Sequence, residues 1–296
     1  MAWHLALLLI AGLLSASPAS AQAERRVALV IGNGAYREAP LRNPVNDARA
    51  MAIALEETGF SVTKLENADR LAMQRAVLAF GKALSSDAVG LFYYAGHGMQ
   101  VRGTNYLIPI NAQAQSEDEV EVEAVDVNYV LARMATAENR LNIVILDACR
   151  DNPFARAFRS GGRGLAAITA PTGTLIAHAT APGATAADGS GANGLFTGEL
   201  IAAIAQGGLR VEDVFKRTRM AVVEKSRGRQ TPWESSSLIS DFYFQPPAAP
   251  IAAAAPAPRP TPAPAPAPWP PSRRHRRRPQ PPVRRMRSTA RHPAWC

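Results

Sequence analysis

The pattern of apolar and polar residues alternates between two periods from about residue 25 to residue 245. Short, nearly continuous apolar runs predict buried strands at Val27–Ile31, Phe60–Leu65, Val89–Tyr94, Leu141–Leu146 and Thr174–Ala179. The segments between them repeat apolar residues every three or four positions, which predicts helices at Asn46–Glu57, Arg70–Leu84, Val125–Met134, Phe196–Ile204 and Val211–Lys225. A last short run, Ser240–Phe244, predicts an edge strand.

Strands that are apolar along their whole length and that alternate with helices indicate a parallel sheet covered on both faces. We therefore predict an α/β fold with a mostly parallel sheet and helices on both faces. In such sheets the segments at the carboxyl ends of the strands carry the functional groups. The residues that follow each predicted strand are thus the first candidates for chemistry.

The N-terminal end differs from this alternating region. Residues 1–21 predict a signal peptide, because the apolar run Leu5–Leu14 is followed by Ala19-Ser20-Ala21, the small-x-small pattern of a cleavage site. The run is shorter than the roughly 20 residues that cross a bilayer, although an uncleaved membrane anchor is the alternative. We expect an exported protein, periplasmic or extracellular, whose globular domain spans residues 22–245.

The C-terminal end predicts two segments without a packed core. Residues 246–271 are rich in Pro and Ala and predict an extended linker, and residues 272–296 predict a basic, disordered tail. Residues 247–296 contain ten Arg and no Asp, Glu or Lys, so removing them from the net charge of +9 leaves −1 for the rest. This argues against specific nucleic-acid binding by the domain. The tail itself suits contact with anionic envelope polymers or lipids.

The chain has two cysteines, Cys149 in an apolar run and Cys296 at its end. Two thiols and five histidines do not have the spacing of a metal site, so we expect no metal or other cofactor. The motifs GxSxG, HExxH and GxxxxGK[ST] are absent, which argues against common serine hydrolases, zinc peptidases and P-loop NTPases. Gly32-Asn33-Gly34 begins like a dinucleotide fingerprint, but the third glycine is missing, which predicts a simple turn.

A histidine and a cysteine follow two successive predicted strands. His97 stands between two glycines after the run Val89–Tyr94, and we expect it to be free of packing neighbours and open to a substrate. Cys149 follows the next predicted strand, Leu141–Leu146, and stands 52 residues after His97. Neighbouring parallel strands end at the same edge of a sheet, so a nucleophile and its base are expected to meet there. Either residue alone would more often be structural.

Residues 25–245 resemble the caspase-like cysteine peptidases, a group that includes the metacaspases and their bacterial relatives. The caspase signature places a histidine about 50 residues before its Gln-Ala-Cys motif. This chain has Gly96-His97-Gly98 and Asp147-Ala148-Cys149 at a matching separation, and Asn43–Ala48 looks like the corresponding metacaspase segment.

The resemblance implies that Cys149 attacks a peptide carbonyl to form a thioester, with His97 as base and then acid. It also implies that the backbone N–H groups of Gly98 and Cys149 stabilise the oxyanion. Some metacaspases use calcium, so calcium dependence is left open.

Two departures from caspases concern specificity. The position two before the nucleophile is Gln in caspases, where it helps to hold a substrate aspartate, and here it is Asp147, as in metacaspases. Asp47 matches a second acid of the metacaspase pocket. Two carboxylates in one pocket would bind a guanidinium or ammonium group, so we expect cleavage after Arg or Lys. The structural alternatives are a helix N-cap for Asp47 and an internal hydrogen bond for Asp147.

Two other functions are alternatives to the cysteine endopeptidase. One is a non-catalytic caspase-like module that binds peptides, and the other is an envelope-binding protein that acts through its basic tail. The presence of both His97 and Cys149 favours the enzyme.

Some residues are weaker candidates for a role in the site. They are His178, for which a packed core histidine is the alternative, and Trp233, which would line a subsite or pack in the core or at its rim. Arg159 and Arg163 are candidate self-cleavage sites.

Overall fold

The computed structural model describes residues 24–149, 154, 164–184, 186 and 191–247. The chain divides into two units, residues 1–249 and 250–296, and all described residues belong to the first. The signal peptide, most of the linker, the tail, Arg159 and Arg163 lie outside the described residues. No helix within the described ranges is long and apolar enough to cross a membrane.

A mostly parallel sheet lies at the centre of the domain, with the strand order β2-β1-β3-β6-β7-β8. Neighbours along this order are parallel as far as β7, and β8 pairs antiparallel with β7. The bounds are β1 Arg26–Gly32, β2 Ser61–Glu66, β3 Val89–Val101, β6 Leu141–Cys149, β7 Thr174–His178 and β8 Trp233–Ser236. Two short strands, β4 Thr104–Leu107 and β5 Val125–Asp126, extend the sheet beyond β3. The predicted sheet is confirmed.

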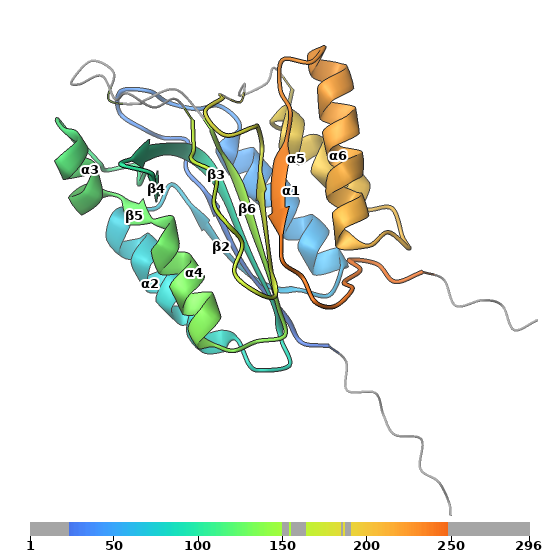
Figure 1. Ribbon diagram of the computed structural model, residues 1–296. Coiled ribbons are helices and arrows are strands. Elements are labelled where there is room, and N and C mark those ends of the chain that lie inside the picture. Colours follow the sequence, from blue (N-terminus) through green and yellow to red (C-terminus); the bar gives the residue numbers. More distant parts are fainter. Residues whose placement is uncertain (1–23, 150–153, 155–163, 185, 187–190, 248–296) are drawn as a thin grey trace, which may run out of the picture. The chain divides into compact units, whose positions relative to one another are not determined.

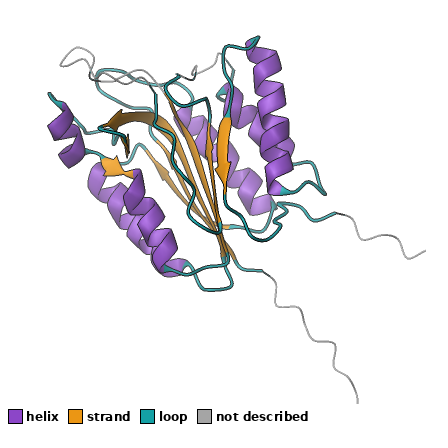
Figure 2. Cartoon of the chain, viewed as in Figure 1, coloured by secondary structure: helices purple, strands orange, loops and turns teal. Residues whose placement is uncertain are grey.

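Helices cover both faces of this sheet, as the sequence predicted (Figures 1 and 2). α1, α5 and α6 pack on one face, and α2 and α4 pack on the other. The bounds are α1 Pro44–Glu57, α2 Arg70–Ala83, α3 Glu117–Glu123, α4 Val127–Thr136, α5 Leu195–Ile204 and α6 Val211–Ser226. One continuous apolar core joins the central strands to α1, α2, α4, α5 and α6, which makes the sheet a rigid support for the residues at its carboxyl edge.

The predicted edge strand Ser240–Phe244 is wrong. Its two phenylalanines are buried and pack against Phe60, and the Arg26 guanidinium lies over the Phe242 ring at 4.8 Å from the ring centroid. Arg26 also donates to the last two carbonyls of the segment, which therefore bond to a side chain and not to a neighbouring strand. The edge strand is Trp233–Ser236, which the sequence analysis missed because it has no apolar alternation.

The short elements near β3 were also not predicted. The sequence did not predict β4 and α3, and the helix predicted at Val125–Met134 begins two residues later in the structure, at Val127. The first two residues of the predicted range form β5 with β4, and the Asp126 carboxylate caps the helix by accepting from the Asn128 N–H at 2.7 Å. Elements of two to seven residues carry too few apolar positions to show a period.

The segment Gly32-Asn33-Gly34, predicted as a simple turn, ends β1 and begins its connection to α1. A Cβ atom on Gly32 would lie 2.3 Å from the carbonyl oxygen of Pro44, so glycine allows α1 to begin directly above the end of β1. The Asn33 side chain is buried and bonds to the backbone of Ala68 and Ile108. These bonds tie the ends of β1, β2 and β4 together at the carboxyl edge of the sheet.

Candidate functional site

His97 lies inside β3 and not in a loop after it. The sequence ended this strand at Tyr94, but β3 continues to Val101 because its last residues pair antiparallel with β4. The backbone around His97 is therefore part of the sheet, and the expectation of an open loop is wrong. This makes the position of the residue more rigid than the sequence suggested.

The pairing of β3 with β6 changes register at His97. Ala95 pairs with Asp147, and Gly98 pairs with Cys149. Three residue steps on β3 thus match two steps on β6, which places a β-bulge at residues 96 and 97. Bulges are common next to active sites, where they redirect a side chain. The backbones that carry His97 and Cys149 consequently lie on neighbouring strands at the same edge, as the sequence predicted.

Two tyrosine hydroxyls hold the backbone of His97. Its N–H donates to the Tyr36 hydroxyl at 2.9 Å, and its carbonyl accepts from the Tyr94 hydroxyl at 2.9 Å. The two hydroxyl oxygens are 3.1 Å apart, and both lie within hydrogen-bond distance of the Ile108 carbonyl. Burial raises the pKa of Tyr94 well above its ordinary value, so this hydroxyl keeps its proton. We call Tyr36 and Tyr94 the tyrosine clamp.

Gly96 makes room for the tyrosine clamp. A Cβ atom on Gly96 would lie 2.6 Å from the hydroxyl oxygen of each tyrosine. His97 is only 4% exposed, and its ring lies against the Tyr36 ring with the centroids 4.5 Å apart. The expectation that His97 has no packing neighbours is therefore wrong, and the glycine before it serves internal packing.

A backbone carbonyl orients the imidazole ring. Nε2 of His97 lies 2.7 Å from the carbonyl oxygen of Ala39. A carbonyl oxygen only accepts hydrogen bonds, so Nε2 carries a proton, and in the neutral ring the lone pair is on Nδ1. Nδ1 is then the atom available to take up a proton. The sequence analysis identified no third group of this kind, because a backbone carbonyl leaves no signal in the residue type.

Asp47 and Asp147 meet at the first turn of α5. The Asp47 carboxylate, on α1, accepts from the Gly194 N–H at 2.8 Å and from the Asn193 side-chain amide at 3.0 Å. The Asp147 carboxylate, on β6, accepts from the Thr197 hydroxyl at 2.9 Å. Gly194 and Thr197 are three residues apart, so they belong to one turn of the helix. The structure therefore brings the two predicted pocket acids together at a helix N-terminus, where negative charge is favoured.

Of the two structural roles considered for these acids, the structure excludes the helix N-cap for Asp47 and contains the internal hydrogen bond of Asp147. Asp47 is not an N-cap, because α1 begins at Pro44 with Asn43 as its N-cap, and the carboxylate reaches α5 instead. The internal hydrogen bond proposed for Asp147 is present, with Thr197 as its donor. Both acids are buried, at 0% and 2% exposure.

A family model described as the caspase domain matches residues 25–243. This chain belongs to the caspase domain family. The resemblance seen in the sequence is thus confirmed, and the chain is a member of a cysteine peptidase family.

Two curated relatives share part of this domain. Mucosa-associated lymphoid tissue lymphoma translocation protein 1 of Homo sapiens is 35% identical over 129 residues, which are 43% of this chain and 15% of the relative. Its homolog in Mus musculus is 34% identical over 129 residues, with the same coverage. The aligned region is therefore a small part of these longer proteins.

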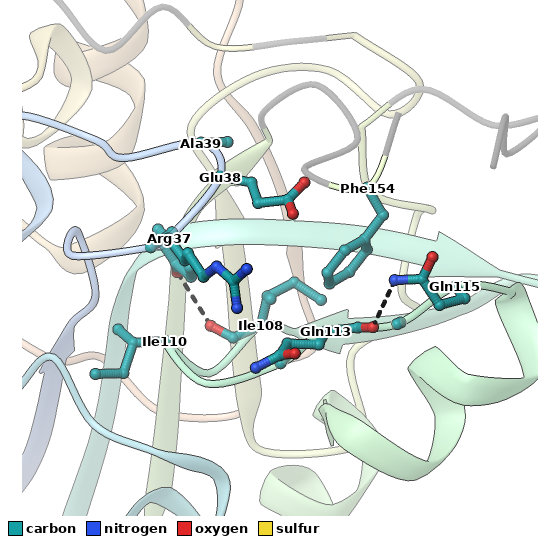
Figure 3. Close-up of a pocket in the computed structure, with 11 residues that line it drawn as sticks. Arg37, Glu38, Ala39, Ile108, Ile110, Gln113, Gln115 and Phe154 are labelled. Atoms are coloured by element: carbon teal, nitrogen blue, oxygen red, sulfur yellow. Dashed lines mark hydrogen bonds between the residues drawn. The ribbon is translucent and has the colours of Figure 1, made fainter. Parts of the chain in front are cut away.

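A cavity of about 170 Å³ lies beside the loop that orients His97 in this caspase domain (Figure 3). It is lined by the loop 36–39, by Ile108 and Ile110 after β4, by residues 112–115 and by Phe154. Tyr36, Ile108 and Phe154 also belong to a small apolar cluster that is separate from the main core. The Phe154 ring points into the cavity toward the loop 36–39. We call this space the loop cavity.

His178 and Trp233, the two weaker candidates, lie next to each other on β7 and β8, which follow β6 in the strand order. His178 is 3% exposed in β7, and burial lowers its pKa to about 4, so it is a neutral, packed core residue at neutral pH. Trp233 begins β8 and pairs with His178. It is 48% exposed, so it is not a core residue.

Proposed function

We propose that this caspase-domain protein is a cysteine endopeptidase that cleaves after Arg or Lys, with Cys149 as the nucleophile and His97 as its base. The observation that carries the proposal is the pairing of Gly98 with Cys149 directly after the bulge at His97. This pairing supports a contact between His97 and Cys149, which lie far apart in the sequence. Because the chain belongs to a family of cysteine peptidases, such a contact suits a catalytic dyad.

In this mechanism the Cys149 sulfur attacks the carbonyl carbon of the scissile bond, and Nδ1 of His97 takes up the thiol proton. The Ala39 carbonyl stabilises the resulting imidazolium through the Nε2–H group. The N–H groups of Gly98 and Cys149 donate to the oxyanion, which is worth about 3 kcal/mol per donor in comparable sites. The imidazolium protonates the leaving amine, and water then hydrolyses the thioester with His97 as base. No metal or other cofactor takes part in these steps.

The preference for Arg or Lys is assigned to Asp47 and Asp147. A guanidinium group can form two parallel hydrogen bonds with one carboxylate, and an ammonium group provides three donors. The first turn of α5 already places both carboxylates in one region, with Thr197 holding the acid on β6. A substrate cation would share these carboxylates with the helix, whereas a substrate aspartate would be repelled.

Cleavage of a peptide library by the purified protein tests this proposal. We expect products that end in Arg or Lys, and none from the Cys149→Ala variant. Cleavage after other residues would contradict the specificity. A protein that binds these peptides without cleaving them would support the alternative, a peptide-binding module.

The tyrosine clamp leads to a kinetic prediction. Tyr36→Phe is expected to lower kcat about tenfold with KM changed by less than about twofold, because it leaves the buried N–H of His97 without an acceptor at a cost of about 1–3 kcal/mol. Tyr106→Phe is the matched control, since Tyr106 lies in the same small cluster with its hydroxyl beside Thr104. Equal kcat values for the two variants would show that the clamp does not position the imidazole.

We further propose that the enzyme is exported and that residues 247–296 bind anionic envelope polymers or lipids. Their ten arginines can each contribute about 1 kcal/mol near an anionic surface, and added salt screens this attraction. The full chain is expected to sediment with anionic vesicles at low salt and to be released at high salt, whereas a chain that ends at residue 246 should stay in solution. Equal sedimentation of the two forms would exclude this role of the tail.

A further inference from the structure

We call Asp47 and Asp147, which bond to the first turn of α5, the acidic site. The loop cavity and the acidic site lie on opposite faces of β3. Tyr93 and Tyr94 are consecutive residues of this strand, so their side chains point to opposite faces. The Tyr93 hydroxyl lies 2.6 Å from the hydroxyl of Thr197, which bonds to Asp147. The Tyr94 hydroxyl lies next to that of Tyr36, which lines the loop cavity. The strand end that carries the imidazole thus separates the two sites.

We propose that the loop cavity is the subsite for the residue that follows the scissile bond, and that it takes an apolar side chain. This inference rests on the proposed peptidase function. A peptide whose Arg or Lys occupies the acidic site has its acyl part on the α5 face of the sheet. The leaving amine lies at His97, because His97 protonates it, so the chain after the scissile bond continues toward the other face. The loop cavity lies on that side, and two of its lining residues, Tyr36 and Ala39, bond to the histidine.

The size and the walls of the loop cavity suit one apolar side chain. A cavity of roughly 150 Å³ holds a benzene ring, so about 170 Å³ holds a Leu or Phe side chain. Ile108, Ile110 and the Phe154 ring provide apolar walls. Arg37 and Glu38 are exposed members of the lining and carry opposite charges. Together they add no net charge that would select a charged side chain, but they can bond to the substrate backbone.

The same loop links the loop cavity to the orientation of His97. Ala39 lines the cavity, and its carbonyl oxygen holds Nε2 of the imidazole at 2.7 Å. Tyr36 lines the cavity as well and accepts from the His97 N–H. A side chain bound in the cavity therefore contacts the loop that positions the proton donor for the leaving amine. Occupation of this subsite is expected to affect kcat as well as KM.

Two quenched fluorescent peptides that differ only in the residue after Arg provide the test. One has Leu at this position and the other has Gly. The wild-type protein is expected to cleave the Leu peptide with a kcat/KM at least about tenfold higher, as apolar pockets commonly achieve. Ala112→Phe, which adds a large side chain to the cavity lining, should reduce this ratio to less than about twofold. The matched control is Ala135→Phe at an exposed position of α4, which should keep the wild-type ratio.

The outcomes separate the subsite from the enzyme. A Leu-to-Gly ratio near one in the wild-type protein, or a wild-type ratio in Ala112→Phe, would overturn the subsite. A folded wild-type protein that cleaves neither peptide would contradict the proposed function itself. If thermal unfolding shows that Ala112→Phe is not folded, Ala112→Leu fills less of the cavity and is expected to lower the same ratio.

Discussion

Replacing Cys149 by alanine is expected to lower kcat/KM for an Arg-containing peptide by at least about 10⁴-fold, because the acyl-enzyme can no longer form. His97→Ala is expected to have an effect of similar size, since the thiol would lose the base that generates the thiolate. Hydrolysis of a fluorogenic peptide measures both. The double variant should be no slower than the slower single variant, because the two residues act as one unit.

The second cysteine provides the matched control. Cys296→Ala removes the other thiol of the chain, far along the sequence from β6, and should retain the wild-type kinetics. Activity that survives in Cys149→Ala would contradict the assignment of the nucleophile. Effects of His97→Ala and Cys149→Ala that multiply in the double variant would contradict their joint action.

Asp147→Asn is expected to lower kcat/KM for an Arg peptide about 100-fold, because the substrate cation loses a buried charged partner at a cost of about 2–5 kcal/mol. The asparagine amide oxygen can still accept from the Thr197 hydroxyl, so the contact with α5 is kept. A peptide with citrulline in place of Arg has nearly the same shape without the charge. The ratio of kcat/KM for the Arg and citrulline peptides is the measured quantity, and it should fall toward one in the variant.

Asp87→Asn makes the same chemical change at an exposed position in the turn before β3, and should leave the Arg-to-citrulline ratio unchanged. Thermal unfolding of both variants measures the structural share of the effect. An Asp147→Asn protein that is less stable but keeps the wild-type ratio would mean that this carboxylate supports α5 and does not bind the substrate.

The sheet could be predicted because its central strands are apolar along their whole length. Val27–Ile31 and Leu141–Leu146 are buried on both faces, and apolar runs of this kind between amphipathic helices are typical of the central strands of a parallel sheet. The wrong or missing predictions concern segments whose backbone pairing does not follow from their residue pattern. Trp233–Ser236 is a strand because it pairs with β7, although its residue pattern is polar. Ser240–Phe244 has an apolar pattern, but among the described residues it forms only one isolated bridge, with Arg210, and Arg26 bonds to its last two carbonyls.

The candidate site was predictable only as far as residue types show their chemistry. The sequence pointed to His97 and Cys149 because an imidazole and a thiol follow neighbouring strands. It could not show that Ala39 orients the imidazole, since any residue has a backbone carbonyl. The tyrosine clamp and the contact of Thr197 with Asp147 depend on tertiary packing between distant segments. The bulge that redirects β3 likewise depends on its register with β6.

Covalent trapping tests the joint action of His97 and Cys149 most directly. A peptide that ends in an arginyl acyloxymethyl ketone carries the cation that the acidic site should bind and a methylene carbon beside the ketone. The Cys149 sulfur would form a thioether bond with this carbon as the carboxylate of the acyloxy group leaves. Mass spectrometry of the wild-type protein is expected to show one adduct per chain, on Cys149, and the adduct should form far more slowly in His97→Ala. A wild-type protein without an adduct, or an adduct on Cys149 that forms equally fast without the imidazole, would contradict the proposed dyad.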